Sequence, residues 1–147
     1  MKRSVLLLLV MLLFLAGCAS GENAATFRLD EGLDLDLTKL SGTMVYAEVF
    51  GMRSEPEEYY GKRVRISGLF SAYQNPFTGE YYYNCIIPDA TACCSQGLQF
   101  FPSEALSYPD DFPEQGAMIT LQGTFSKNEE NVYMCSLNDA VIESVDE

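Results

Sequence analysis

Alternating apolar and polar residues predict a β-rich domain in the second half of the chain. From residue 63 to residue 68, arginine or serine alternates with valine, isoleucine or glycine. This period of two predicts a half-buried strand whose inward positions are Val64, Ile66, Gly68 and Phe70. The turn-forming stretch 75–79 follows, and residues 81–87 return to β-favouring side chains, so the two segments predict a hairpin.

Further strands are predicted from similar patterns at residues 97–101, 119–125 and 132–142. Residues 102–115 contain three prolines and several acidic residues, which predicts a loop rather than a helix or strand. Short strands separated by turns favour a small closed barrel, because closure removes exposed strand edges.

Before the strands, residues 44–52 predict a short helix. Val45, Val49 and Met52 recur at helical spacing, and Pro56 prevents the helix from continuing. Ser41 or Thr43 is a candidate cap for its first turn. Residues 33–37 alternate leucine with aspartate, which fits an edge strand or arm as well as an acidic linker.

The N-terminus has the pattern of an export signal. Lys2 and Arg3 precede an apolar run that is shorter than the about 20 residues that a membrane-spanning helix needs. The run ends in Leu15-Ala16-Gly17-Cys18, which resembles the lipobox of bacterial lipoproteins. This resemblance implies that Cys18 receives a diacylglycerol, with acyl chains such as palmitate, and becomes the N-terminus after cleavage. An ordinary secretory signal and an uncleaved anchor are the alternatives.

This pattern predicts a division of the chain into a signal peptide at 1–17, a lipidated acidic tether at 18–40 and a folded domain at 41–147. The predicted location is extracytoplasmic, on the cell membrane or on an outer membrane where the source has one. The membrane is the expected partner, through the lipid on Cys18, since each buried methylene contributes about 0.8 kcal/mol to anchoring.

Composition narrows the classes of function. The chain has 9 basic residues, 21 acidic residues and a formal net charge of −12, from which we expect no nucleic-acid partner. It has no histidine, which removes the Ser-His and Cys-His catalytic pairs and histidine-ligated zinc enzymes. We therefore expect no enzyme activity and assign no catalytic residue.

Two motifs resemble the strands of bacterial extracytoplasmic OB-fold domains. They are the run 57–68, with its Tyr-Tyr-Gly-Lys-Arg-Val entry into the first long strand, and the Gly-x-x-Ile-x-Leu-x-Gly-x-Phe run at 116–125. The segment 89–94, with its Cys-Cys pair, resembles uncharacterised bacterial lipoproteins and permease-associated OB domains. The resemblance implies a mainly β, OB-fold-like five-stranded barrel with one N-terminal helix, and no established activity.

Cys85, Cys93, Cys94 and Cys135 are the cysteines left after the candidate lipid site. Four converging thiolates would form a structural zinc site, although the chain lacks a Cys-x-x-Cys spacing. Two disulfides are the alternative in an exported domain, and a bond between the adjacent cysteines is disfavoured by geometry. The third interpretation of the four cysteines is that their thiols are free or redox-active.

Consecutive tyrosines at 81–83, together with Tyr73, could present a stacking surface for sugars or single-stranded nucleic acid. We expect instead that Tyr82 or its two neighbours pack the barrel wall. The resulting function hypothesis is a membrane-anchored module that binds a small ligand or ion, with zinc as its candidate cofactor. A disulfide-stapled structural or interaction domain, whose partner is an envelope protein, and a thiol redox protein are the alternatives.

Overall fold

The computed structural model describes residues 32–89, 94–128 and 134–146. The helix α2 (Gly42–Ser54) precedes the long strands, and single 3₁₀ turns, η2 (Leu37–Lys39) and η3 (Pro56–Glu58), flank it. The predicted helix is therefore present, and its N-cap is Ser41. The strands are β1 (Leu35–Asp36), β2 (Arg63–Gln74), β3 (Tyr81–Pro88), β4 (Ser95–Pro102), β5 (Met118–Lys127) and β6 (Cys135–Asp146).

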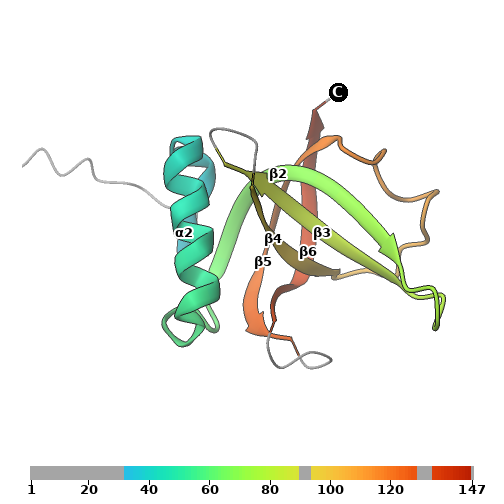
Figure 1. Ribbon diagram of the computed structural model, residues 1–147, viewed down its shortest axis with the longest axis horizontal. Coiled ribbons are helices and arrows are strands. Elements are labelled where there is room, and N and C mark those ends of the chain that lie inside the picture. Colours follow the sequence, from blue (N-terminus) through green and yellow to red (C-terminus); the bar gives the residue numbers. More distant parts are fainter. Residues whose placement is uncertain (1–31, 90–93, 129–133, 147) are drawn as a thin grey trace, which may run out of the picture.

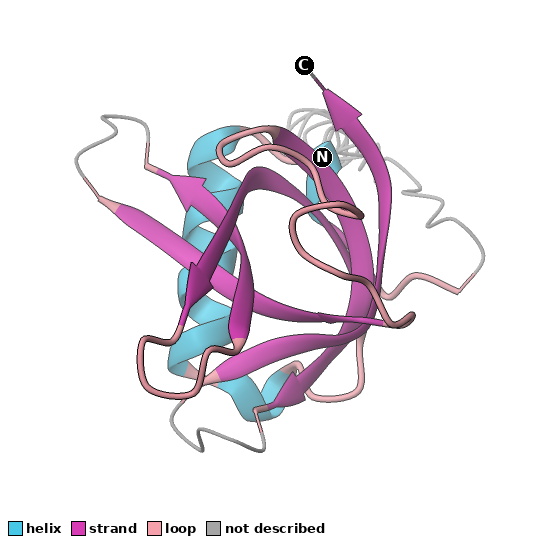
Figure 2. Ribbon diagram, turned by 90° about the vertical axis from the view of Figure 1, so that its right-hand side faces the viewer, coloured by secondary structure: helices cyan, strands magenta, loops and turns pink. Residues whose placement is uncertain are grey.

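Hydrogen bonding joins the long strands in a ring (Figure 2). β2 pairs with β3, β3 with β4, β6 with β5, and β5 with β2, all antiparallel, and β4 pairs with β6 in parallel. The prediction of a mainly β, OB-like fold with one N-terminal helix is confirmed. β1 adds a sixth strand to the predicted five.

The inward side chains of the ring form one core, which is closed at both ends. α2 covers one end, where Val49 and Met52 are fully buried. Residues 103–117, between β4 and β5, lie at the opposite end (Figure 1). The alternation predicted for β2 is confirmed, since the inward positions 64, 66, 68 and 70 are all buried.

Residues 33–40 belong to the folded domain. β1 runs parallel to β2, with Leu35 opposite Val64, and Leu37 is fully buried against the core. Asp36 is only 3% exposed; its carboxylate accepts hydrogen bonds from Thr38 and lies 3.8 Å from the Arg65 guanidinium. The tether predicted at 18–40 is therefore too long at its C-terminal end, because Leu35 lies in β1 and Leu33 and Leu37 are buried rather than facing solvent.

Candidate ligand-binding face

Three aromatic side chains lie in a row across β2, β3 and β4 on the outer face of the sheet. Tyr73 is opposite Tyr82 in the β2–β3 pairing. Tyr83 is opposite Phe100 in the β3–β4 pairing, and both point inward, so the neighbouring residues Tyr82 and Phe101 point outward. We call Tyr73, Tyr82 and Phe101 the outer aromatic row; Tyr73 is 58% exposed, and the other two are half-buried.

The three residues of the outer aromatic row lie outside the hydrophobic core. In the part of the chain that the structure describes, no ring contact involves any of the three. The inner rings behave differently: the Tyr83 and Phe112 centroids are 4.1 Å apart and stacked, and Phe70 stacks on Phe112 at 5.6 Å. These inner contacts fix residues 103–117 to the end of the sheet. Of the two options predicted, Tyr82 or its two neighbours, the structure has the neighbours: Tyr83 packs on the core, and the Tyr81 ring lies 4.7 Å from the Tyr108 ring.

Uncharged polar groups adjoin the row. Asn84 lies two residues from Tyr82 on the same face and is opposite both Ser71 and Gln99. The Asn128 side-chain amide donates to the Gln99 side-chain oxygen Oε1 at 2.8 Å, which fixes the orientation of the Gln99 amide. The outward positions 69–73 of β2, 82–86 of β3 and 97–101 of β4 carry no charged side chain. The face is therefore aromatic, amide-bearing and electrically neutral.

An ordered turn extends the face at the tip of the β2–β3 hairpin. The Asn75 side chain accepts the backbone N–H groups of Phe77 at 2.9 Å and Thr78 at 3.3 Å, and Gly79 takes a φ of +78°. This Asx turn holds Phe77 at 95% exposure. Sequence analysis singled out Tyr73 and Tyr82, but it missed Phe77 and Phe101. The alternation of side chains along β4 was the signal that could have placed Phe101 on the outer face, since its neighbour Phe100 points inward.

The structure separates the cysteines of the predicted metal site. Cys85 is fully buried in the middle of β3, and Cys135 is a partly buried residue at the start of β6. Cys94 is exposed, and its carbonyl accepts the Asp89 N–H. Because Ser95 is opposite Pro88, Cys94 lies roughly 13 Å along β3 from Cys85, at about 3.3 Å per residue.

Among residues 32–89, 94–128 and 134–146, no three Cys, His, Asp or Glu side chains are grouped so that they could hold a metal ion. Cys93 lies outside the described residues, so the site of Cys85, Cys93, Cys94 and Cys135 stays a prediction. Both predicted disulfide pairings need Cys85 and Cys135 in a bond. Both are free thiols here, so neither pairing is present in this structure.

Burial raises the pKa of two of the described thiols, those of Cys85 and Cys135. It raises the pKa of Cys85 to about 12, from an ordinary value of 9.0. Burial is also the largest influence on Cys135 and raises its pKa, although the Tyr60 hydroxyl and the Arg53 guanidinium beside it act in the opposite direction. A thiol that stays protonated is a poor nucleophile and a poor metal ligand.

We expect Cys85 to resist alkylation in the native protein and to react after unfolding. In the native state its thiolate form and its access to reagent are both suppressed, whereas Cys135 is only partly buried and should react measurably. Stability from the neutral Cys85 thiol is present below pH 9.0 and is lost as the pH rises toward about 12. Iodoacetamide labelling with peptide mass spectrometry measures both sites; equal native rates would contradict the burial of Cys85.

The candidate lipid site, Cys18, and the predicted signal at 1–17 lie outside the described residues. In the ranges that the structure does describe, no helix is long and apolar enough to cross a membrane. The lipid attachment remains a prediction from the sequence.

Comparison with known proteins identifies no family. No protein-family model and no curated protein matches the chain. One matching solved structure is that of a "putative nucleic acid-binding lipoprotein" from Klebsiella pneumoniae subsp. pneumoniae, with 16% identity and a TM-score of 0.42, covering 65% of this chain and 81% of that one. The prediction that nucleic acid is no partner is corrected by this match, because acidic composition was its only basis and a matching lipoprotein carries that description.

Proposed function

We propose that this chain is a lipid-anchored extracytoplasmic protein whose OB-like domain binds an oligosaccharide on the outer aromatic row. The observation that carries the proposal is the row itself: three aromatic rings on adjacent strands that take no part in the core. Aromatic rings in folded proteins are normally buried or packed on one another, since each buries a large apolar area. Three rings on one outer face, with Tyr73 58% exposed and the other two partly exposed, favour a ligand with flat, weakly polar surfaces.

The chemistry around the rings favours a neutral, hydroxyl-rich ligand. Sugar rings present C–H faces that stack on aromatic side chains, and their hydroxyls both donate and accept hydrogen bonds. Asn84 carries an amide, which also donates and accepts; Gln99 beside it is 6% exposed, and its side-chain oxygen accepts from Asn128. No charged side chain interrupts the face between these groups.

The position of the row in the fold supports a binding role. Counted around the ring from β2, the strands β3 and β4 are the second and third strands of the OB arrangement. In OB folds, the face of strands two and three and the loop between strands one and two bind oligosaccharides and oligonucleotides. Tyr82 and Phe101 lie on that face, and Phe77 lies in that loop.

The lipid on Cys18 would place this face close to the membrane surface on the outer side. The resemblance of Leu15-Ala16-Gly17-Cys18 to a lipobox supports this location. Envelope glycans are the oligosaccharides available there. Binding without catalysis fits the neutral face, which offers no acid or base to a glycosidic bond.

Tyr82→Ala is expected to weaken oligosaccharide binding at least about fivefold, taking the about 1–3 kcal/mol that stacking of a nucleic-acid base on one aromatic ring contributes as the scale. Tyr82→Phe should retain most of the affinity, since it keeps the ring. The control is Phe50→Ala, which removes an aromatic residue 56% exposed on α2, away from the row. The measurement is calorimetric titration of the full-length chain in neutral nanodiscs with neutral N-acetylglucosamine and glucose oligomers.

A titration with single-stranded oligothymidylate provides the second arm. If the protein binds the oligonucleotide but no oligosaccharide, and if Tyr82→Ala abolishes that binding, the ligand of this face is nucleic acid and not an oligosaccharide. Oligosaccharide binding that is unchanged in Tyr82→Ala would contradict the assignment of the face.

A further inference from the structure

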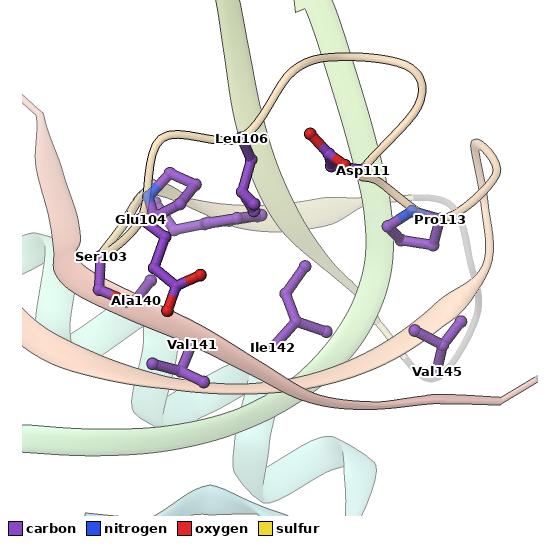
Figure 3. Close-up of a pocket in the computed structure, with 11 residues that line it drawn as sticks. Ser103, Glu104, Leu106, Asp111, Pro113, Ala140, Val141, Ile142 and Val145 are labelled. Carbon is purple, nitrogen blue, oxygen red and sulfur yellow. The ribbon is translucent and has the colours of Figure 1, made fainter.

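A hollow separates residues 103–117 from the last strand, at the end of the sheet opposite α2. Its volume is about 380 Å³. Phe100, Leu106 and Ile142 make its lining apolar, and Figure 3 shows Leu106 and Asp111 of the loop across the hollow from Ile142 and Val145 of β6. No residue of the outer aromatic row lines it.

One edge of β6 is open beside this hollow. The pairing of β4 with β6 ends where Pro102 is opposite Ala140, and the Ser103 N–H donates to the Ala140 carbonyl at 2.9 Å. Beyond that point β6 continues to Asp146 and pairs only with β5. Among the described strands, none is bonded to the other edge of β6 from residue 141 onward. An unpaired edge offers backbone donors and acceptors to another extended chain.

The local sequence explains why the edge opens. Pro102 has no N–H group and cannot extend the ladder from β4. On β6, two residues, Asp139 and Ala140, lie opposite the single residue Gly123 of β5, and Asp139 takes the left-handed φ of +50°. A bulge of this kind bends and twists a strand, here at the residue where β6 parts from β4.

A second hollow adjoins the first and lies between residues 112–117 and the ends of β5 and β6. It has a volume of about 780 Å³ and shares Pro113 and Val145 with the first. Met118 and Asp146 line it at the far end of the β5–β6 pair. The open part of β6, from residue 141 to residue 146, is roughly 20 Å long at about 3.3 Å per residue. This length suits one added strand.

The rim of the two hollows is acidic. Glu104 and Asp111 line the first, Glu114 and Asp146 line the second, and no Lys or Arg lines either. We propose that this β6 edge groove binds an extended segment of a partner protein by strand addition, with apolar side chains in the hollows and Lys or Arg beside them. The negative charge of the rim favours a partner segment that carries Lys or Arg.

Charge also argues against a second copy of this chain as the occupant. This edge is lined by the acidic residues Glu104, Asp111, Glu114 and Asp146, and the chain as a whole has a net charge of −12. Pairing two such edges would place like charges together, which is destabilising. A basic peptide meets no such repulsion.

The test uses the full-length chain in neutral nanodiscs and a fluorescent peptide of alternating lysine and valine. We expect saturable binding that weakens about tenfold or more in Val145→Lys, which adds a positive charge at a position 46% exposed in the groove. The matched control is Met44→Lys, which changes a residue 56% exposed on α2 and should leave binding unchanged.

Two N-methylated peptides separate strand addition from adhesion by charge alone. Methylation of the amides along one edge of the peptide should abolish binding, and methylation along the other edge should leave it intact, because an added strand pairs on one side. Equal binding of both analogues overturns the proposal, as does binding that Val145→Lys does not weaken. Sedimentation experiments test the remaining occupant. A wild-type dimer that Val145→Lys converts to a monomer would overturn the proposal and show that a second copy of the chain occupies the groove.

Discussion

Gly68→Ala is expected to destabilise the domain by about 3 kcal/mol, at the upper end of what overpacking costs. A β-carbon at residue 68 would lie 2.6 Å from the Ile87 Cδ1 atom, 2.7 Å from the Cys85 Sγ atom and 2.7 Å from the Ile86 carbonyl oxygen. Side chains could move slightly, but the carbonyl belongs to the β2–β3 ladder and is fixed by it. The new methyl group therefore forces apart the two strands at the centre of the core.

The matched control is Gly51→Ala in α2. There the new β-carbon would meet only the Tyr59 hydroxyl at 3.5 Å, an ordinary contact, so helix propensity should stabilise the protein by about 0.5–1 kcal/mol. Thermal unfolding of both variants measures the difference. The melting temperature of Gly68→Ala should fall by about 10–20 °C, and that of Gly51→Ala should rise. A Gly68→Ala protein as stable as the wild type would show that β2 and β3 do not approach as described.

Cys18→Ala is expected to abolish lipid attachment completely and to leave the unprocessed precursor. The prediction rests on the basic start, the apolar run and the Leu15-Ala16-Gly17-Cys18 boundary. Because the thiol is the only proposed attachment point, its removal eliminates the acyl chains that anchor the domain. Metabolic labelling with a radioactive fatty acid, together with the mass of the product, measures the effect.

Cys135→Ala is the control for that experiment, since it removes a cysteine from β6 and leaves the lipobox intact. It should be labelled and processed like the wild type. Fatty-acid label retained by Cys18→Ala would contradict the lipobox, and loss of label in both variants would point to failed export rather than a missing attachment site.

The sequence determined the elements and the side of each strand that faces the core. Alternation is a local property, so it placed Val64, Ile66 and Phe70 inward without knowledge of their partners. Pro56 marked the end of the helix because a proline removes a backbone donor regardless of tertiary contacts.

The candidate surfaces depended on tertiary structure. Local patterns did not reveal that Tyr73, Tyr82 and Phe101 align across three strands, since that alignment follows from the register of β2, β3 and β4. The sequence likewise left the cysteines as one candidate set, yet register holds Cys85 and Cys94 apart along the ladder.

The β6 edge groove needed the whole fold. Its floor and rim come from β4, β6 and residues 103–117, which stacking of Phe112 on Tyr83 holds against the sheet. Its open edge arises where a bulge at Asp139 and the missing donor of Pro102 separate two paired strands. Sequence alone determined the period and the turns, because each depends on neighbours along the chain. Only the tertiary structure decided which faces are left uncovered, because that depends on which distant strands pair and where their pairing stops.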